Sequence, residues 1–165
     1  MTIFDYVPYL GLSYGEAALQ PLLFQLRITT APKLAKNDED THLSAKSLGI
    51  EICFTDERFV NIPGKQFPEG ALVVSNITFY GEGHPGYSVY SGSIFPGITL
   101  ASTKADVLRT FGIPNSPIYS DTGELLPDED DWNMRWDRTD HCFFFTFTDE
   151  GEISDMAIQL PLDQA

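Results

Sequence analysis

Histidine and cysteine side chains are the groups best suited to acid–base, nucleophilic or metal chemistry, and this sequence has few of them. The histidines are His42, His84 and His141. None of them stands at zinc-motif spacing from a cysteine or from another histidine. The sequence also lacks a nucleophile elbow and a phosphate-binding loop. We therefore predict that the protein is not an enzyme and that it has no catalytic residues, no metal site and no cofactor.

The protein has two cysteines, Cys53 and Cys142, and each lies in a short apolar stretch that is typical of a β-strand. The start of the sequence does not resemble a signal peptide, so we expect the protein in the cytoplasm. Disulfides are rare in that compartment. We therefore expect two buried free thiols. A bridge between the two cysteines is the alternative, because spacing along the chain does not determine pairing.

An acidic segment followed by two tryptophans is the most informative group of side chains. Residues 110–134 contain no lysine or arginine. The acidic and aromatic residues of this region are Asp121, Glu124, Asp128, Glu129, Asp130, Asp131, Trp132 and Trp136. Carboxylates bind lysine and arginine side chains through charge-assisted hydrogen bonds, and tryptophan rings offer cation–π faces. We predict that these residues bind a partner protein.

A second acidic run, formed by Asp38, Glu39 and Asp40, lies in a segment that is predicted to be a loop. We assign this run to the same partner-binding site. The alternative is that the acidic segments are only solvated and that both tryptophans lie in the core. Trp132 and Trp136 occupy alternate positions of an expected strand, so we expect at least one of them to be buried.

The net charge of −14, from 24 acidic and 10 basic residues, narrows the choice of partner. Such a charge repels nucleic acids and anionic membrane surfaces, so we expect neither as a partner. A basic protein is the partner that this field attracts. The alternative is that the acidity serves solubility alone. No apolar stretch approaches the length of a membrane span, and we expect the protein in the cytoplasm.

Two helices are expected in the sequence. The first of them follows Ser13. Together with Glu16, this serine matches a capping box, and apolar residues continue to Leu26. Pro21 interrupts the pattern because it lacks a backbone donor and crowds the preceding turn. The helix therefore either kinks at Pro21 or restarts with this proline in its first turn.

A second helix is predicted over residues 104–111, and its boundaries are the clearest in the sequence. Ser102 or Thr103 can act as its N-cap. Gly112 can adopt the positive φ that often ends a helix, and Pro114 prevents the helix from continuing. This segment directly precedes the acidic region, so we expect it to fix one end of that region.

The remaining segments alternate in the manner of β-strands. The expected strands cover residues 41–47, 50–54, 71–80, 132–136, 141–147 and 156–160. A bend is expected at Leu48 and Gly49, so the first two form either two short strands or one bulged strand. Residues 149–151 form a hairpin turn with Gly151. We predict one α+β domain over residues 1–165, mainly an antiparallel sheet with about two helices packed on it.

Part of the chain resembles small outer-membrane lipoproteins that assist β-barrel assembly. The resemblance covers residues 97–114, a short helix followed by a glycine–x–proline unit, and the strands that come after it. This sequence lacks the signal peptide and the lipid-attachment cysteine of those proteins. The resemblance therefore implies a local likeness of fold, with an envelope or assembly factor as an alternative function.

A broader resemblance is to bacterial immunity proteins, in particular those of contact-dependent growth inhibition. It is carried by residues 4–11, 48–54, 77–80, 87–92 and 102–114. The resemblance implies a cytoplasmic antidote that binds its cognate toxin domain, often a basic nuclease, and blocks the active site. These families share no universal binding residues, so the predicted site rests on charge and position. A small enzyme is the remaining alternative.

Overall fold

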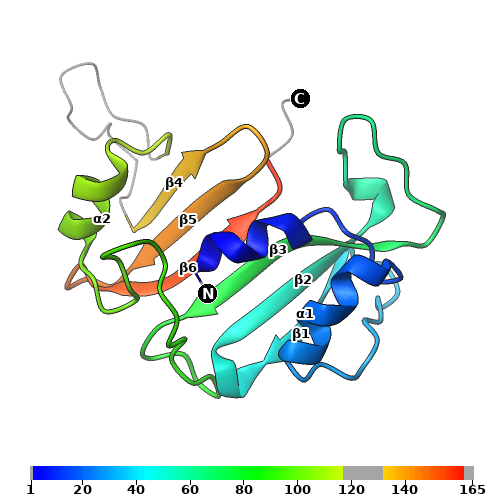
Figure 1. Cartoon of the computed structure of the whole chain (residues 1–165), viewed down its shortest axis with the longest axis horizontal. Helices are drawn as coiled ribbons and strands as arrows, with labels where there is room; N and C mark the ends of the chain where they lie inside the picture. The colour runs from blue at the N-terminus through cyan, green and yellow to red at the C-terminus, as the bar shows by residue number, and fades with distance from the viewer. Residues whose placement is uncertain (1, 117–131, 162–165) are drawn as a thin grey trace.

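The computed structural model describes residues 2–116 and 132–161 and contains a six-stranded sheet (Figure 1). The strands are β1 (Asp40–Ala45), β2 (Ile50–Asp56), β3 (Leu72–Tyr80), β4 (Asn133–Asp137), β5 (Cys142–Phe147) and β6 (Ile153–Gln159). Their order across the sheet is β1-β2-β3-β6-β5-β4, and every neighbouring pair is antiparallel. The predicted α+β class with a mainly antiparallel sheet is therefore confirmed.

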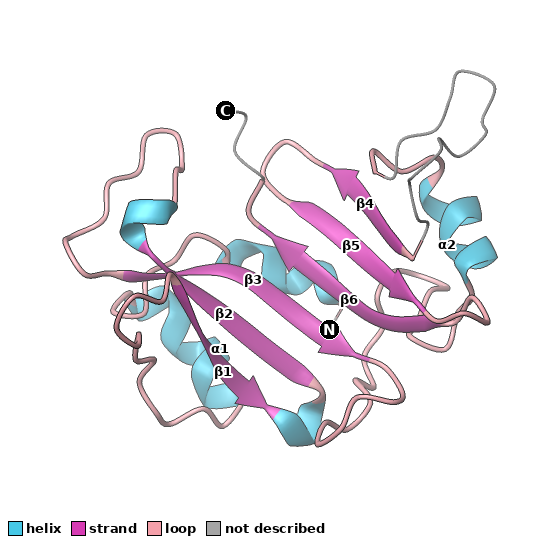
Figure 2. Ribbon diagram, turned by 180° about the vertical axis from the view of Figure 1, so that it is seen from behind, coloured by secondary structure: helices cyan, strands magenta, loops and turns pink. Residues whose placement is uncertain are grey.

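The longer helical segments lie on one face of this sheet. They are α1 (Gln20–Gln25), α2 (Lys104–Phe111) and the 3-10 helix η1 (Ile3–Tyr9), while the single 3-10 turns are η2 (Ala17–Leu19), η3 (Lys46–Leu48) and η4 (Glu57–Phe59). Figure 2, seen from behind, shows the opposite face, and none of the described α-helices lies over it. None of the described helices has the length and apolarity needed to cross a lipid bilayer.

The first predicted helix begins later and is shorter than its sequence suggests. The backbone N–H of Ser13 donates to Glu16 Oε1 at 2.8 Å, which is one half of the expected capping box. Ser13 itself forms a bridge with Val73, so the helical segment begins at Ala17 as η2 and continues as α1. Pro21 lies in the first turn of α1, where its missing N–H removes no helical hydrogen bond. The restart at Pro21 is therefore the alternative that the chain adopts.

The second predicted helix is confirmed as α2, and Thr103 is its N-cap. The Thr103 side chain accepts from the backbone N–H of Asp106, and Asp106 Oδ2 accepts from the Thr103 N–H at 2.9 Å. These reciprocal bonds satisfy donors that a helix start leaves unpaired. Gly112 follows the helix with a φ of 76°, as its glycine identity suggested.

Gly49 sets the turn between β1 and β2. After the turn η3, this glycine has a φ of 67° and a ψ of 34°, a left-handed conformation that favours glycine. The chain then reverses into β2, and the pairing places His42 opposite Cys53 and Ser44 opposite Glu51. The predicted bend therefore determines which polar side chains become neighbours across the two strands.

Large aromatic side chains fill the core between the sheet and the helices. Trp136, Phe143 and Phe145 are buried on the core face, and the ring of Phe111 from α2 lies 5.1 Å from that of Phe143. Every second residue of β2 is buried, as expected for a strand with one face on a core. The side chains between them point to the uncovered face, which is therefore available for function.

Candidate functional site

Figure 2 shows the face of the sheet that the described α-helices leave uncovered, and residues at alternate strand positions, such as Glu51, Cys53 and Thr55 of β2, point to this face. Cross-strand pairing builds one row of this face from His42, Cys53, Asn76 and Gln159. An antiparallel sheet that packs one face on a core commonly leaves its other face polar. In this row the histidine lies directly opposite the cysteine.

A cavity of about 320 Å³ opens beside this row. Its polar lining on the sheet side consists of Asp40, Cys53, Thr55, Ser75, Asn76 and Gln159. The hydroxyls of Thr55 and Ser75 hydrogen-bond to each other at 2.7 Å. Phe59 at the end of η4 and the next two residues, Val60 and Asn61, also line the cavity. A cavity of this volume is large enough for a small ligand.

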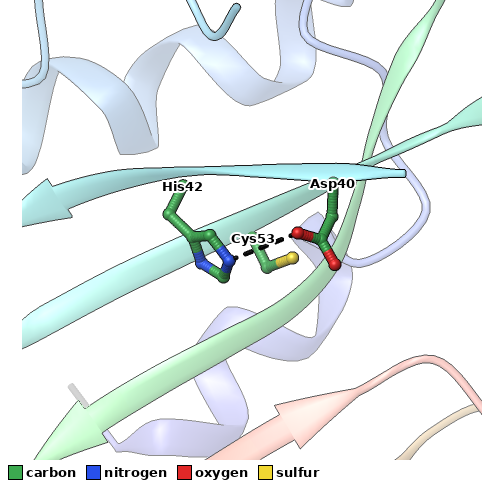
Figure 3. Close-up of side chains that lie close together, drawn as sticks. All are labelled: Asp40, His42 and Cys53. Carbon is green, nitrogen blue, oxygen red and sulfur yellow. Dashed lines mark ion pairs between the residues drawn. The ribbon is translucent and has the colours of Figure 1, made fainter. Parts of the chain in front are cut away.

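Asp40, His42 and Cys53 lie close together (Figure 3), and two of them, Asp40 and Cys53, also line the cavity. One ligand atom of each residue lies within 4.8 Å of the others, and His42 Nε2 is 3.5 Å from Asp40 Oδ1. Burial raises the pKa of the Cys53 thiol, and the carboxylates of Asp40 and Glu51 raise it further. Cys53 is therefore a protonated thiol at neutral pH.

Glu51 lies next to this cluster and is held by several donors. Its carboxylate accepts hydrogen bonds from Ser44 Oγ at 2.7 Å, from the Tyr80 hydroxyl at 3.1 Å and from the Tyr87 hydroxyl. The Nδ1 atom of His42 lies 3.4 Å from Glu51 Oε1. Burial alone would raise the pKa of Glu51, but the bonds from Tyr87, Ser44 and Tyr80 outweigh burial and lower it. Glu51 is therefore ionised and fixed in orientation.

His84 forms a second histidine–carboxylate pair on the same face. Its Nε2 atom lies 2.9 Å from Ser154 Oγ and 3.5 Å from Asp155 Oδ2. A hydrolytic triad needs the carboxylate on one ring nitrogen and the hydroxyl on the other. Both contacts of His84 involve the same nitrogen, so this arrangement does not have the geometry of a triad.

His141 lies on the core side of the sheet, on the face shared with Phe143. Its ring centroid is 6.1 Å from that of Phe4 and 6.4 Å from that of Phe143. Its Nδ1 atom lies 2.7 Å from Asp140 Oδ1, and its side chain is only 12% exposed. His141 therefore packs among aromatic rings and leaves little room for a substrate.

The acidic run Asp38, Glu39 and Asp40 is exposed at the start of β1, the outermost strand on its side of the sheet. Asp40 is the first residue of that strand, whereas the sequence predicted a loop there. The other predicted acidic residues lie outside the described part of the chain. They are Asp121, Glu124, Asp128, Glu129, Asp130 and Asp131.

The two tryptophans have different environments, and one of them corrects the predicted site. Trp132 is 50% exposed just before β4. Trp136 is 1% exposed, stacks on Phe143 with centroids 5.6 Å apart, and donates its indole N–H to Gly112 O at 3.3 Å. The expectation that at least one tryptophan is buried is confirmed, but Trp136 is wrong as a partner-binding residue because the core covers it.

The predicted site residues are also widely separated. Asp38, Glu39 and Asp40 lie at the β1 edge, and Trp132 adjoins β4 at the opposite edge. Five strand spacings of about 4.8 Å place these edges roughly 24 Å apart. The described residues of the predicted site therefore form two separate regions rather than one compact site.

Spacing along the chain missed the Asp40, His42 and Cys53 cluster because its members meet across two strands. The signal that could have found it is the bend at Gly49, since a turn there fixes the register of the flanking strands. Cys53 and Cys142 are not joined by a disulfide, as expected, and Cys142 is buried whereas Cys53 is only partly buried. Comparisons with protein-family models, with curated proteins and with solved structures found no match.

Proposed function

We propose that this protein is a cytoplasmic, non-enzymatic immunity protein that binds and neutralises a basic, nuclease-type toxin domain. The observation that carries the proposal is the run of exposed carboxylates Asp38, Glu39 and Asp40 at the outermost described strand, β1, of a strongly acidic domain. A nuclease must bind phosphates, so its active site is positively charged. An acidic protein surface matches that charge and can occlude the site.

The net charge of −14 supports rapid capture of a basic partner. Electrostatic attraction steers encounters and can raise association rates to about 10⁸ M⁻¹s⁻¹ at low salt. A rapid rate favours protection because an uninhibited toxin turns over many substrate molecules. The charge thus supports both the class of partner and a function in which the speed of binding matters.

The dimensions of the sheet also support a protein partner. A standard interface covers roughly 800 Å² on each side, which corresponds to a patch about 30 Å across. The two sheet edges that carry Asp40 and Trp132 are roughly 24 Å apart. One partner protein can therefore reach both edges, whereas a small ligand cannot.

The proposal is tested with candidate basic toxin domains encoded beside the gene of this protein. Stopped-flow association is measured at low and at physiological salt for the wild type and for the double variant Asp38→Asn/Glu39→Gln. We expect the variant to associate about three- to tenfold more slowly at low salt. The difference should shrink at physiological salt, because the screening length falls to about 8 Å.

The matched control is Glu69→Gln/Glu82→Gln, which removes two exposed carboxylates from other loops. We expect this control to slow association less than Asp38→Asn/Glu39→Gln does. An equal loss in both variants would show that only total charge matters and would remove the assigned surface. If no neighbouring basic domain is bound or neutralised in co-expression, the proposed function itself fails.

A further inference from the structure

We propose that Asp40, His42 and Cys53 form a binding site for a divalent transition metal ion, and that Zn²⁺ fits their chemistry best (Figure 3). The set supplies an oxygen, a nitrogen and a sulfur ligand from two neighbouring strands. Zn²⁺ accepts all three ligand types, whereas Mg²⁺ and Ca²⁺ prefer oxygen ligands alone. This site goes beyond the proposed immunity function, which does not require a metal.

The spacing of the ligand atoms is close to that of a tetrahedral zinc site. Zinc bonds of about 2.0 to 2.3 Å place neighbouring ligand atoms roughly 3.3 to 3.6 Å apart. His42 Nε2 and Asp40 Oδ1 are already 3.5 Å apart. All three ligand atoms lie within 4.8 Å of one another, so the Cys53 thiol needs only a small shift to complete the set. The hairpin between β1 and β2 thus preorganises the ligands.

Glu51 gives His42 the orientation found in metal-binding histidines. Such histidines usually donate their second ring N–H to a carboxylate, which fixes the ring and its tautomer. Glu51 Oε1 lies 3.4 Å from His42 Nδ1, while His42 Nε2 faces Asp40. Hydrogen bonds from Ser44, Tyr80 and Tyr87 hold this carboxylate in place. An ordinary surface ion pair between Asp40 and His42 would not require this second layer of contacts.

The site has a route for the metal and an open coordination position. Asp40 and His42 are each about half exposed, so an ion can approach from solvent. Asp40 and Cys53 also line the cavity of about 320 Å³. Three protein ligands with a fourth position open to water or to a small donor is the arrangement of exchangeable zinc sites. On binding, the metal takes the place of the proton on the Cys53 sulfur.

The proposal is tested by titrating the tag-free, reduced protein with Co²⁺, a spectroscopic substitute for Zn²⁺. We expect one equivalent to bind, with a near-ultraviolet sulfur-to-metal charge-transfer band that added Zn²⁺ removes. Cys53→Ser should abolish the band, and Asp40→Asn should weaken binding at least tenfold. Glu51→Gln should weaken it about 10- to 100-fold, as expected for the partner of a metal-binding histidine.

Two variants serve as matched controls. Cys142→Ser removes the other cysteine thiol, and His84→Gln removes the other histidine–carboxylate pair of the same face. Both should keep the band and the affinity of the wild type. Asp40 is 55% exposed, so Asp40→Asn provides a folded variant even if Cys53→Ser unfolds the protein. Circular dichroism establishes that each variant compared is folded.

A wild-type protein that shows no sulfur band would overturn the proposal. So would a band that persists in folded Cys53→Ser, or one that Cys142→Ser removes instead. Unchanged affinity in Asp40→Asn would exclude its carboxylate as a ligand and leave no three-ligand site. The toxin-binding variants leave all three metal ligands intact, so the two proposals can fail separately.

Discussion

The position of Gly49 requires glycine, both because of its backbone conformation and because of the atoms close to it. Its φ is 67°, and a Cβ atom at this position would lie 2.6 Å from the backbone nitrogen of Tyr90. We expect Gly49→Ala to lower the free energy of unfolding by about 2–4 kcal/mol, because strain in the left-handed region and backbone overlap add together. Urea unfolding monitored by circular dichroism measures this loss.

Gly64 separates the effect of left-handed strain from the effect of backbone overlap. Its φ is 77°, but no atom lies within 4 Å of a Cβ built there. We expect Gly64→Ala to cost only about 1 kcal/mol, from conformational strain alone. If Gly49→Ala lowered the free energy of unfolding no more than Gly64→Ala does, the backbone of residues 88–90 would not lie close to the turn at Gly49.

Asp56 provides a pH-dependent contribution to stability at the end of β2. Its carboxylate accepts from Arg58 Nε at 2.8 Å, from Arg58 Nη2 at 2.9 Å and from the Arg58 backbone N–H at 3.0 Å. The side chain and then the backbone of Arg58 lower the pKa of Asp56 to about 2. A lowered carboxyl pKa stabilises the folded state above the usual value of 3.8, and this contribution disappears as the pH falls towards about 2.

We therefore predict that Asp56→Asn loses less stability than the wild type when the pH is lowered from about 4 to about 2. The urea midpoint of each protein, measured across this interval, gives the comparison. Parallel losses in the two proteins would mean that Asp56 is not the group that titrates.

The two tryptophans in and beside β4 have different environments. Trp136 lies within the strand and points into the core, whereas Trp132 precedes the first strand residue and is half exposed. We expect Trp136→Ala to cost about 3–5 kcal/mol of stability, because it leaves a large cavity among aromatic rings. Trp132→Ala should cost less than about 1 kcal/mol.

Urea unfolding of both variants checks this prediction, and binding to the basic partner gives a second comparison. Trp132→Ala should weaken binding if the β4 edge belongs to the interface. Comparable destabilisation by the two substitutions would contradict the assignment of Trp136 to the core and Trp132 to the surface.

The helical elements show what local sequence can and cannot predict. Helix α2 was predictable at both ends because Thr103, Asp106 and Gly112 act through local hydrogen bonds and backbone geometry. The start of α1 was not, because Ser13 pairs with Val73 of β3 instead of capping a helix. Ser13 could either cap a helix or pair with a distant strand, and the tertiary fold decides between these two interactions.

At the scale of the whole molecule, acidity and fold make separate contributions to the proposed function. The charge of −14 acts over the distance at which a partner approaches, and it needs no particular fold. The fold decides where that charge meets a surface, and it puts Asp38, Glu39 and Asp40 at the β1 edge of the described sheet. A basic partner would therefore be attracted by the whole molecule and oriented by one edge.

The sequence by itself determined the strand pattern, the antiparallel α+β class, the second helix and the acidic character. Each depends on alternation, local hydrogen bonding or composition, which are properties of neighbouring residues. Only the tertiary structure decided that Trp136 is buried, that the two sheet edges lie apart, and that Asp40, His42 and Cys53 meet. Those relations depend on strand register and strand order, because pairing joins residues that are distant along the chain.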